Sequence, residues 1–324
     1  MMFVLNETTA MFPTGHSMLQ EIIFSVLLQI SGIIAAIGNL FVMSVIICNK
    51  SLHTPSNILL LHLALIDHLT GICLIIASAF YIEGNFDSFH EIENGVSMCV
   101  ILSIFNLLFI GIDRLLSLSY PFQYMNINDR VKSWVTVAAI WFLATIVYVF
   151  SFYGQNFVVI DCGEFLSNVD MGTVIREFTL GGIVLISIMI HIRVYCIAAN
   201  QARRIAQSQT ESQGQSPINL KAIKTTLIVL GAFCVCYFPV LFFQMSTFNC
   251  SPLGGKNANN VLAIATFFLY SGCTVNPVIY TLRREEFKNQ IKRFLNKCCF
   301  SRCKLMVENS IEMSISTTRR EQAY

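Results

Sequence analysis

Three polar side chains lie inside long apolar runs of this sequence. Asp67 stands near the middle of one run, and Ser103 and Asn276 stand in two others. A carboxylate in apolar surroundings needs a proton, a cation or a set of hydrogen-bond donors. Neutral hydroxyl and amide oxygens are suited to share a small hard cation with it. We therefore expect a cation site if the fold brings the three together; the alternative is simple hydrogen bonding between helices.

A second polar feature is the adjacent pair Asp113 and Arg114, near the end of the apolar run 94–120. The Arg side chain is permanently charged, so it must pair with the Asp or reach a polar groove between helices. A helix bundle with two stable arrangements would use both options. The pair is therefore a candidate switch at the edge of a membrane.

Two later apolar runs each contain a proline. Pro239 follows Tyr237 by two residues, and Pro277 lies between Asn276 and Tyr280. Proline removes a backbone hydrogen bond and kinks a helix. Because aromatic and polar residues flank both prolines, we expect hinges rather than purely structural kinks.

Membrane helices must position these residues, because the chain is 55% hydrophobic and 12% charged, with a mean hydropathy of +0.63. A spanning helix needs about 20 mostly apolar residues, and seven stretches qualify. The predicted fold is an all-α bundle of seven transmembrane helices over residues 21–282, with residues 1–20 outside the membrane. The seven stretches are 21–48, 57–82, 94–120, 133–153, 172–199, 221–247 and 259–282.

The distribution of Lys and Arg predicts the orientation. Residues 1–20 contain none, whereas most basic residues lie in loops and tail on the opposite side. Basic loops stay in the cytoplasm, so the N-terminus is expected outside. Asn6 begins an Asn-Glu-Thr glycosylation pattern on that side. The outer loops are acidic. For most of these acids we expect a solvated loop surface, and the functional alternative is attraction of a cationic small molecule or peptide. The small net charge of +2 is no sign of nucleic-acid binding.

The segment after the seventh stretch, residues 283–297, alternates basic and apolar residues at helical spacing. This pattern is typical of an amphipathic helix that lies on the inner leaflet and contacts membrane lipid. Cys298 and Cys299 follow it directly, a placement that suits palmitoylation. Residues 298–324 are expected to be a cytoplasmic tail.

The motifs together resemble those of the rhodopsin-like G-protein-coupled receptors, over residues 32–299. The resemblance implies a plasma-membrane receptor for an extracellular ligand that activates a heterotrimeric G protein, with arrestin and receptor kinases as further partners and no catalysis. It makes Asp67, Ser103 and Asn276 an expected sodium site. The matching motifs are Gly38-Asn39, Leu63-Ala64-Leu65-Ile66-Asp67, Asp113-Arg114-Leu115, Trp141, Cys236-Tyr237-Phe238-Pro239 and Asn276-Pro277-Val278-Ile279-Tyr280.

Within that family the chain looks most similar to the melanocortin and adenosine receptor group, partly because the cysteine that usually begins the third helix is missing. Cys162 is then free or pairs with Cys250, the other outer-loop cysteine, and we expect the pair. Family positions imply a ligand pocket, in which the amine-binding Asp is replaced by Val96 and the retinal lysine by Tyr270. The expected pocket residues are Glu93, Val96, Gln244, Thr266 and Tyr270.

Two other classes of membrane protein were weighed. A polytopic transporter, the main alternative, usually has related halves and broken helices at mid-membrane, and this sequence has no internal repeat. An intramembrane enzyme would need paired acids, a nucleophile with its base, or a metal-ligand cluster at membrane depth. The chain is therefore not expected to be an enzyme.

Overall fold

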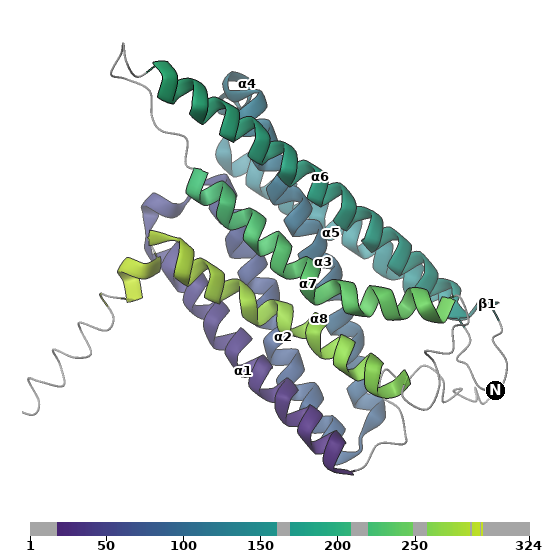
Figure 1. Ribbon diagram of the computed structural model, residues 1–324. Coiled ribbons are helices and arrows are strands. Elements are labelled where there is room, and N and C mark those ends of the chain that lie inside the picture. The colour runs from purple at the N-terminus through teal and green to yellow at the C-terminus, as the bar shows by residue number, and fades with distance from the viewer. Residues whose placement is uncertain are drawn as a thin grey trace, which may run out of the picture. The chain divides into compact units, whose positions relative to one another are not determined.

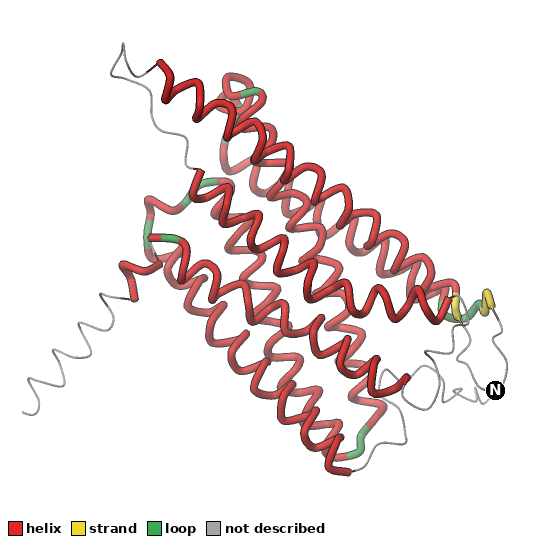
Figure 2. The backbone as a smooth tube through the Cα atoms, in the orientation of Figure 1, coloured by secondary structure: helices red, strands yellow, loops and turns green. Residues whose placement is uncertain are grey.

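The computed structural model describes residues 18–160, 169–208, 220–248 and 258–293, except residues 286 and 292. Within this part of the chain, seven helices are long and apolar enough to cross a membrane. The predicted seven-helix bundle is therefore confirmed, and Figures 1 and 2 show its course. The seven helices are α1 (Met18–Cys48), α2 (Pro55–Glu83), α3 (Phe86–Ser119), α5 (Asp129–Gly154), α6 (Met171–Ser208), α7 (Leu220–Phe248) and α8 (Ala258–Arg283).

Short elements connect the long helices. They are η2 (Lys50–Leu52), α4 (Pro121–Asn126), and an antiparallel pair of strands, β1 (Val158–Ile160) and β2 (Val169–Asp170). Helix α4 lies directly after α3 and begins with a proline, whose fixed φ suits the first position of a helix. It places a short helical turn beside the end of α3 that carries Asp113 and Arg114.

The third spanning helix begins eight residues earlier than its apolar run. Helix α2 ends at Gly84, whose φ of 72° is the left-handed conformation that closes many helices. The Asn85 side chain then accepts a hydrogen bond from the Ser88 backbone nitrogen at 3.2 Å and caps α3. The acidic residues between 87 and 93, expected in a loop, therefore lie on the first turns of α3.

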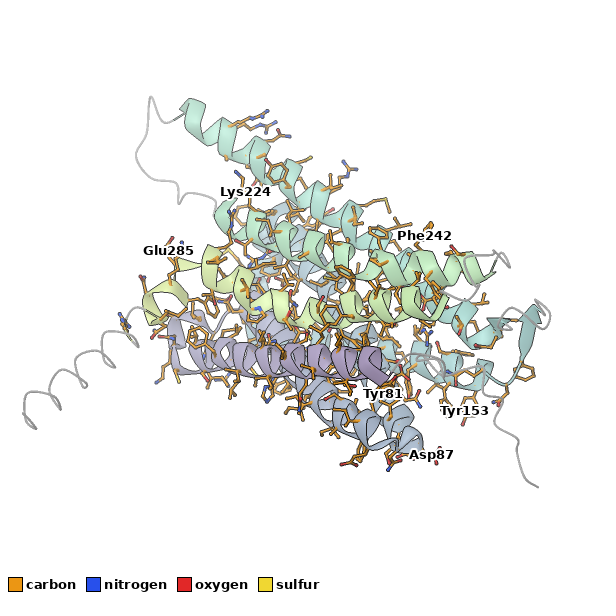
Figure 3. The ribbon with its side chains drawn as sticks, turned by 60° about the horizontal axis from the view of Figure 1, so that its bottom comes forward. Tyr81, Asp87, Tyr153, Lys224, Phe242 and Glu285 are labelled. Carbon is orange, nitrogen blue, oxygen red and sulfur yellow. The ribbon has the colours of Figure 1, made fainter. Side chains whose placement is uncertain are left out.

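The two ends of the bundle differ in charge. Figure 3 shows Asp87 and Tyr153 at one end and Lys224 at the opposite end. This separation matches the acidic and basic faces that the sequence predicts, while the direction of insertion stays a prediction.

Helix α8 approaches α1 closely at its proline. A Cβ atom on Gly38 would lie 2.8 Å from Cγ of Pro277, so only glycine leaves room for the kinked helix. One residue later, the fully buried Asn39 donates a hydrogen bond to the Cys273 carbonyl oxygen at 3.0 Å. Small residues and side-chain hydrogen bonds of this kind hold membrane helices together. The seventh helix is thereby fixed near its kink.

The chain divides into two compact units, Met1–Tyr280 and Thr281–Tyr324. In the second unit, residues 287–291 are helical, which confirms the short helix expected after the seventh span. Lys288 and Glu285 form an ion pair at 3.5 Å. The guanidinium of Arg284 lies 5.9 Å from the centre of the Phe287 ring.

Candidate functional site

The structure brings Asp67, Ser103 and Asn276 together in the middle of the bundle. Asn276 on α8 donates a hydrogen bond from Nδ2 to Oδ2 of Asp67 on α2 at 2.7 Å. Ser103 on α3 donates from Oγ to Oδ1 at 3.5 Å, a long and weak bond. All three residues are buried, and Asp67 is only 3% exposed. Three helices therefore meet at one carboxylate, as the cation-site expectation requires.

A cavity of about 30 Å³ lies beside this carboxylate and is lined by all three residues. A water molecule needs roughly 10–15 Å³ measured in this way, so the space admits a small ion with a water ligand. A carboxylate offers about four acceptor positions, and the two hydrogen bonds leave some of them for a cation. No cluster of three or more His, Cys, Asp or Glu residues suited to a transition metal occurs in the described ranges. The donor set fits a hard monovalent cation.

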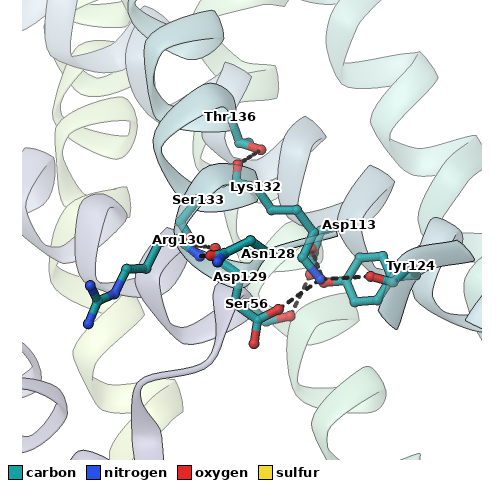
Figure 4. A network of polar contacts seen from close by, with 9 residues as sticks. All are labelled: Ser56, Asp113, Tyr124, Asn128, Asp129, Arg130, Lys132, Ser133 and Thr136. Atoms are coloured by element: carbon teal, nitrogen blue, oxygen red, sulfur yellow. Dashed lines mark hydrogen bonds and ion pairs between the residues drawn. The ribbon is translucent and has the colours of Figure 1, made fainter. Parts of the chain in front are cut away.

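The carboxylate of Asp113 is held by two hydroxyl groups at one end of α3 (Figure 4). Ser56 on α2 donates to Oδ2 at 2.5 Å, and Tyr124 on α4 donates to Oδ1 at 2.6 Å. Burial and the hydrogen bond to this carboxylate raise the pKa of the Tyr124 phenol. The phenol therefore stays protonated as a donor. Arg114, the next residue on α3, is half-buried.

Lys132 on α5 completes this polar network. Its Nζ lies 3.6 Å from the centre of the Tyr124 ring, donates to the Tyr124 backbone oxygen at 3.0 Å, and pairs with Asp129 at 2.8 Å. Helices α2, α4 and α5 thus surround the end of α3 at Asp113. Ser56 and Tyr124 were not among the predicted site residues. Nothing in the sequence indicates that Tyr124 contacts Asp113, because that contact depends on the direction of α4.

Both predicted hinge prolines lie inside their helices, Pro239 in α7 and Pro277 in α8. Tyr237 is 1% exposed, and its ring stacks on that of Phe233, one turn earlier, at 5.8 Å between ring centres. Tyr280 is also buried. The residues of both predicted hinges are therefore packed within the bundle.

The expected ligand-pocket residues are partly brought together. Val96 on α3 and Tyr270 on α8 share one buried apolar cluster, and Tyr270 lies within electrostatic range of Glu93. Thr266 is fully buried, and its hydroxyl finds no hydrogen-bond partner among the described residues. Gln244 on α7 is half-buried, and no hydrogen bond joins it to the other four within the described ranges.

Two charged residues of α6, Arg176 and Glu177, were not among the predicted site residues, and Arg176 lies within electrostatic range of the pocket residue Tyr270. Glu177 is 5% exposed, and its carboxylate accepts hydrogen bonds from Arg176 and from Tyr237. The signal that could have identified the pair is an adjacent Arg and Glu inside an apolar run, because charges at membrane depth are rarely accidental.

Several predicted sites lie outside the described residues. These are the glycosylation site Asn6, the cysteines Cys162 and Cys250, and the palmitoylation sites Cys298 and Cys299. They remain predictions from the sequence.

Comparison with known proteins gives one consistent result. The family model described as "7 transmembrane receptor (rhodopsin family)" matches residues 38–280. Melanocortin receptor 5 of Rattus norvegicus is 26% identical, covering 83% of this chain and 82% of the relative. Trace amine-associated receptor 5 of Mus musculus is 27% identical, with 89% of each chain covered. Adenosine receptor A2b of Mus musculus is 23% identical over 86% of this chain and 91% of its own length.

Proposed function

This chain belongs to the rhodopsin family of seven-transmembrane receptors, and from that premise we propose how it receives and transmits a signal. It is a multi-pass membrane protein and a G-protein-coupled receptor; the comparisons do not favour the transporter alternative. We place the N-terminus outside the plasma membrane and the ligand between the outer halves of the helices. Ligand binding then favours one of two arrangements of the bundle.

The observation that carries the coupling role is the pair of hydroxyl donors on Asp113. Ser56 and Tyr124 connect the end of α3 to α2 and α4 through one carboxylate. An arrangement fixed by so few bonds can be exchanged for another when a G protein binds around Arg114. Arrestin and receptor kinases would act on the same cytoplasmic face. Tyr280 and the Pro277 kink would adjust the inner end of α8.

The middle cavity supports an allosteric sodium site. Asp67 supplies the negative charge, Ser103 a hydroxyl oxygen, and the cavity beside them has room for a small ion. Asn276 holds the carboxylate in place through its 2.7 Å hydrogen bond. A cation bound there stabilises the arrangement of α2, α3 and α8 described above. It therefore opposes any ligand that favours a different arrangement.

The coupling assignment is tested by Arg114→Ala in the full-length receptor, with Lys50→Ala as the control for loss of an exposed basic residue. Guanine-nucleotide exchange is measured on a purified heterotrimeric G protein, beside surface expression. We expect the Arg114 variant to reach the surface and lose exchange activity, while the Lys50 variant keeps it. Normal exchange by Arg114→Ala would refute the assignment.

A further inference from the structure

The ion pair in the outer half of α6 is used neither by the coupling switch nor by the sodium cavity. Arg176 and Glu177 lie in the second turn of a helix that begins at Met171. Glu177 is almost completely buried. Charges at such a position are costly and usually mark a ligand or ion site. The pair therefore requires a functional explanation.

Both carboxylate oxygens of Glu177 accept a hydrogen bond, whereas Arg176 donates to the described residues from only one of its nitrogens. Glu177 accepts from Nε of Arg176 at 3.0 Å on Oε1 and from the Tyr237 hydroxyl at 3.1 Å on Oε2. An arginine has five N–H donors, and this pair uses one. Among the described residues, no acceptor receives a hydrogen bond from either terminal nitrogen of Arg176. The Arg176 side chain is 23% exposed, so its terminal nitrogens are not fully enclosed by the described residues.

A second charged group faces the same region from α3. Tyr270 lies within electrostatic range of both Glu93 and Arg176, and it packs in one cluster with Ile92 and Val96 of α3, which flank Glu93 in sequence. Asp170, which accepts two hydrogen bonds from Thr173, also lies within electrostatic range of Arg176. The region around Arg176 thus holds three carboxylates and one guanidinium, so negative charge is in excess. A carboxylate accepts about four hydrogen bonds, and Glu93 can therefore receive a ligand amino group beside its present contacts.

We propose that the outer pocket recognises a zwitterionic ligand of the amino-acid type, whose carboxylate binds the terminal nitrogens of Arg176 and whose ammonium group binds Glu93. This inference rests on the proposed receptor function and names the ligand class. The terminal nitrogens of an arginine form the planar fork that matches a carboxylate. The excess negative charge selects an ammonium group at the other end of the ligand.

The ion pair also connects the ligand to the α7 hinge. A ligand carboxylate on the terminal nitrogens shares the positive charge of Arg176 with Glu177, and this weakens the attraction between Arg176 and Glu177. The Glu177 carboxylate can then shift, and this changes its hydrogen bond with the Tyr237 hydroxyl. Because Tyr237 stands two residues before Pro239, the change reaches the proposed hinge of α7. Tyr237→Phe removes this hydroxyl alone. The variant should still bind the ligand, and the ligand should change its nucleotide exchange less than it changes that of the wild type.

The test uses full-length receptor in lipid nanodiscs and matched compounds. Each set contains an α-amino acid, the amine formed by its decarboxylation, and the acid that lacks its amino group. Binding is measured by the shift in thermal unfolding, and signalling by GDP release from a heterotrimeric G protein. We expect at least one amino acid to bind, with its amine and acid about 10- to 100-fold weaker, as loss of a charged hydrogen bond implies.

A double variant, Arg176→Gln with Glu177→Gln, removes both charges together. It leaves no unpaired buried carboxylate, which a single substitution would create, and Gln keeps an acceptor for Tyr237. We expect it to bind the amino acid no better than the amine. Arg204→Gln, an exposed position on the same helix, should preserve the preference of the wild type.

Two results would overturn the ligand class: binding of no amino acid in the panel, or equal binding of amine and amino acid by the wild type. The receptor assignment is judged separately. A wild type that binds an amino acid but never promotes GDP release contradicts the coupling role and sustains the ligand class. A wild type that promotes GDP release yet ignores every amino acid contradicts the ligand class alone.

Discussion

Replacing Asp67 with asparagine should abolish the sensitivity of agonist binding to sodium. The substitution keeps the size of the side chain and removes its negative charge. In the wild type the carboxylate accepts one short hydrogen bond, from Asn276 at 2.7 Å, and one long bond, from Ser103 at 3.5 Å. Both donors are neutral, so the buried carboxylate has no compensating positive charge from them. A sodium ion in the adjacent cavity would supply it.

The expected magnitude follows from the coupling between two sites. Allosteric coupling free energies are typically about 1–3 kcal/mol, or roughly 5–150-fold in affinity. The cavity of about 30 Å³ is lined by residues of α2, α3, α7 and α8, so an ion there would bear directly on the helices that the proposed two-state change rearranges. We therefore expect sodium to lower agonist affinity by roughly tenfold or more in the wild type. The uncharged amide of the Asp67→Asn variant cannot replace the electrostatic attraction for the ion, and the effect should vanish.

The assay measures agonist affinity in rising sodium chloride, with potassium chloride at matched ionic strength. Ser78→Ala is the control, because Ser78 is a buried polar residue of the same helix whose hydroxyl bonds only to the Ile75 carbonyl oxygen among the described residues. It should respond to sodium like the wild type. Equal sodium sensitivity in the wild type and in Asp67→Asn would mean that the carboxylate is structural.

Two further predictions concern the ends of the bundle. Tyr124→Phe removes the 2.6 Å hydrogen bond to Asp113 and should change the rate of basal nucleotide exchange by roughly fivefold, because the free energy of a hydrogen bond to a charged group is reduced by partial exposure. Tyr148→Phe is the control, and equal exchange rates in the two variants would contradict the role of Tyr124. Labelling intact cells with a membrane-impermeant thiol reagent should modify Cys162 and Cys250 only after reduction, and labelling of both without it would exclude their bond.

The positions of the helices were predictable because length and apolar composition determine which segments cross a membrane. Helix ends were less predictable, because local capping determines them. Acidic residues at 87, 91 and 93 suggested a loop before the third helix. The structure places them on α3, since Asn85 caps the helix and Gly84 ends the preceding one. The acidic residues therefore suggested the wrong start for the third helix, whereas the capping residues Gly84 and Asn85 indicate the correct one.

The polar sites divide in the same way. Asp67 was predictable because a mid-helix carboxylate demands partners, and the oxygen donors of neighbouring runs were the natural candidates. The contact between Glu177 and Tyr237 was not predictable, since 60 residues separate them and only the packing of α6 against α7 brings them together. Tyr124 reaches Asp113 for a similar reason, because the direction of α4 decides where its hydroxyl points.

The outer ion pair and the sodium cavity share residues, and this bears on how they act. Tyr237 donates its hydroxyl to Glu177 and stacks on Phe233, which lines the cavity beside Asp67. Tyr270 lines that cavity too and lies within range of Arg176. A ligand that moves Tyr270, or that shifts Phe233 through Tyr237, would therefore alter the walls of the proposed cation site. Because linkage is reciprocal, an ion bound there would change the affinity for that ligand by the same factor by which the ligand changes the affinity for the ion.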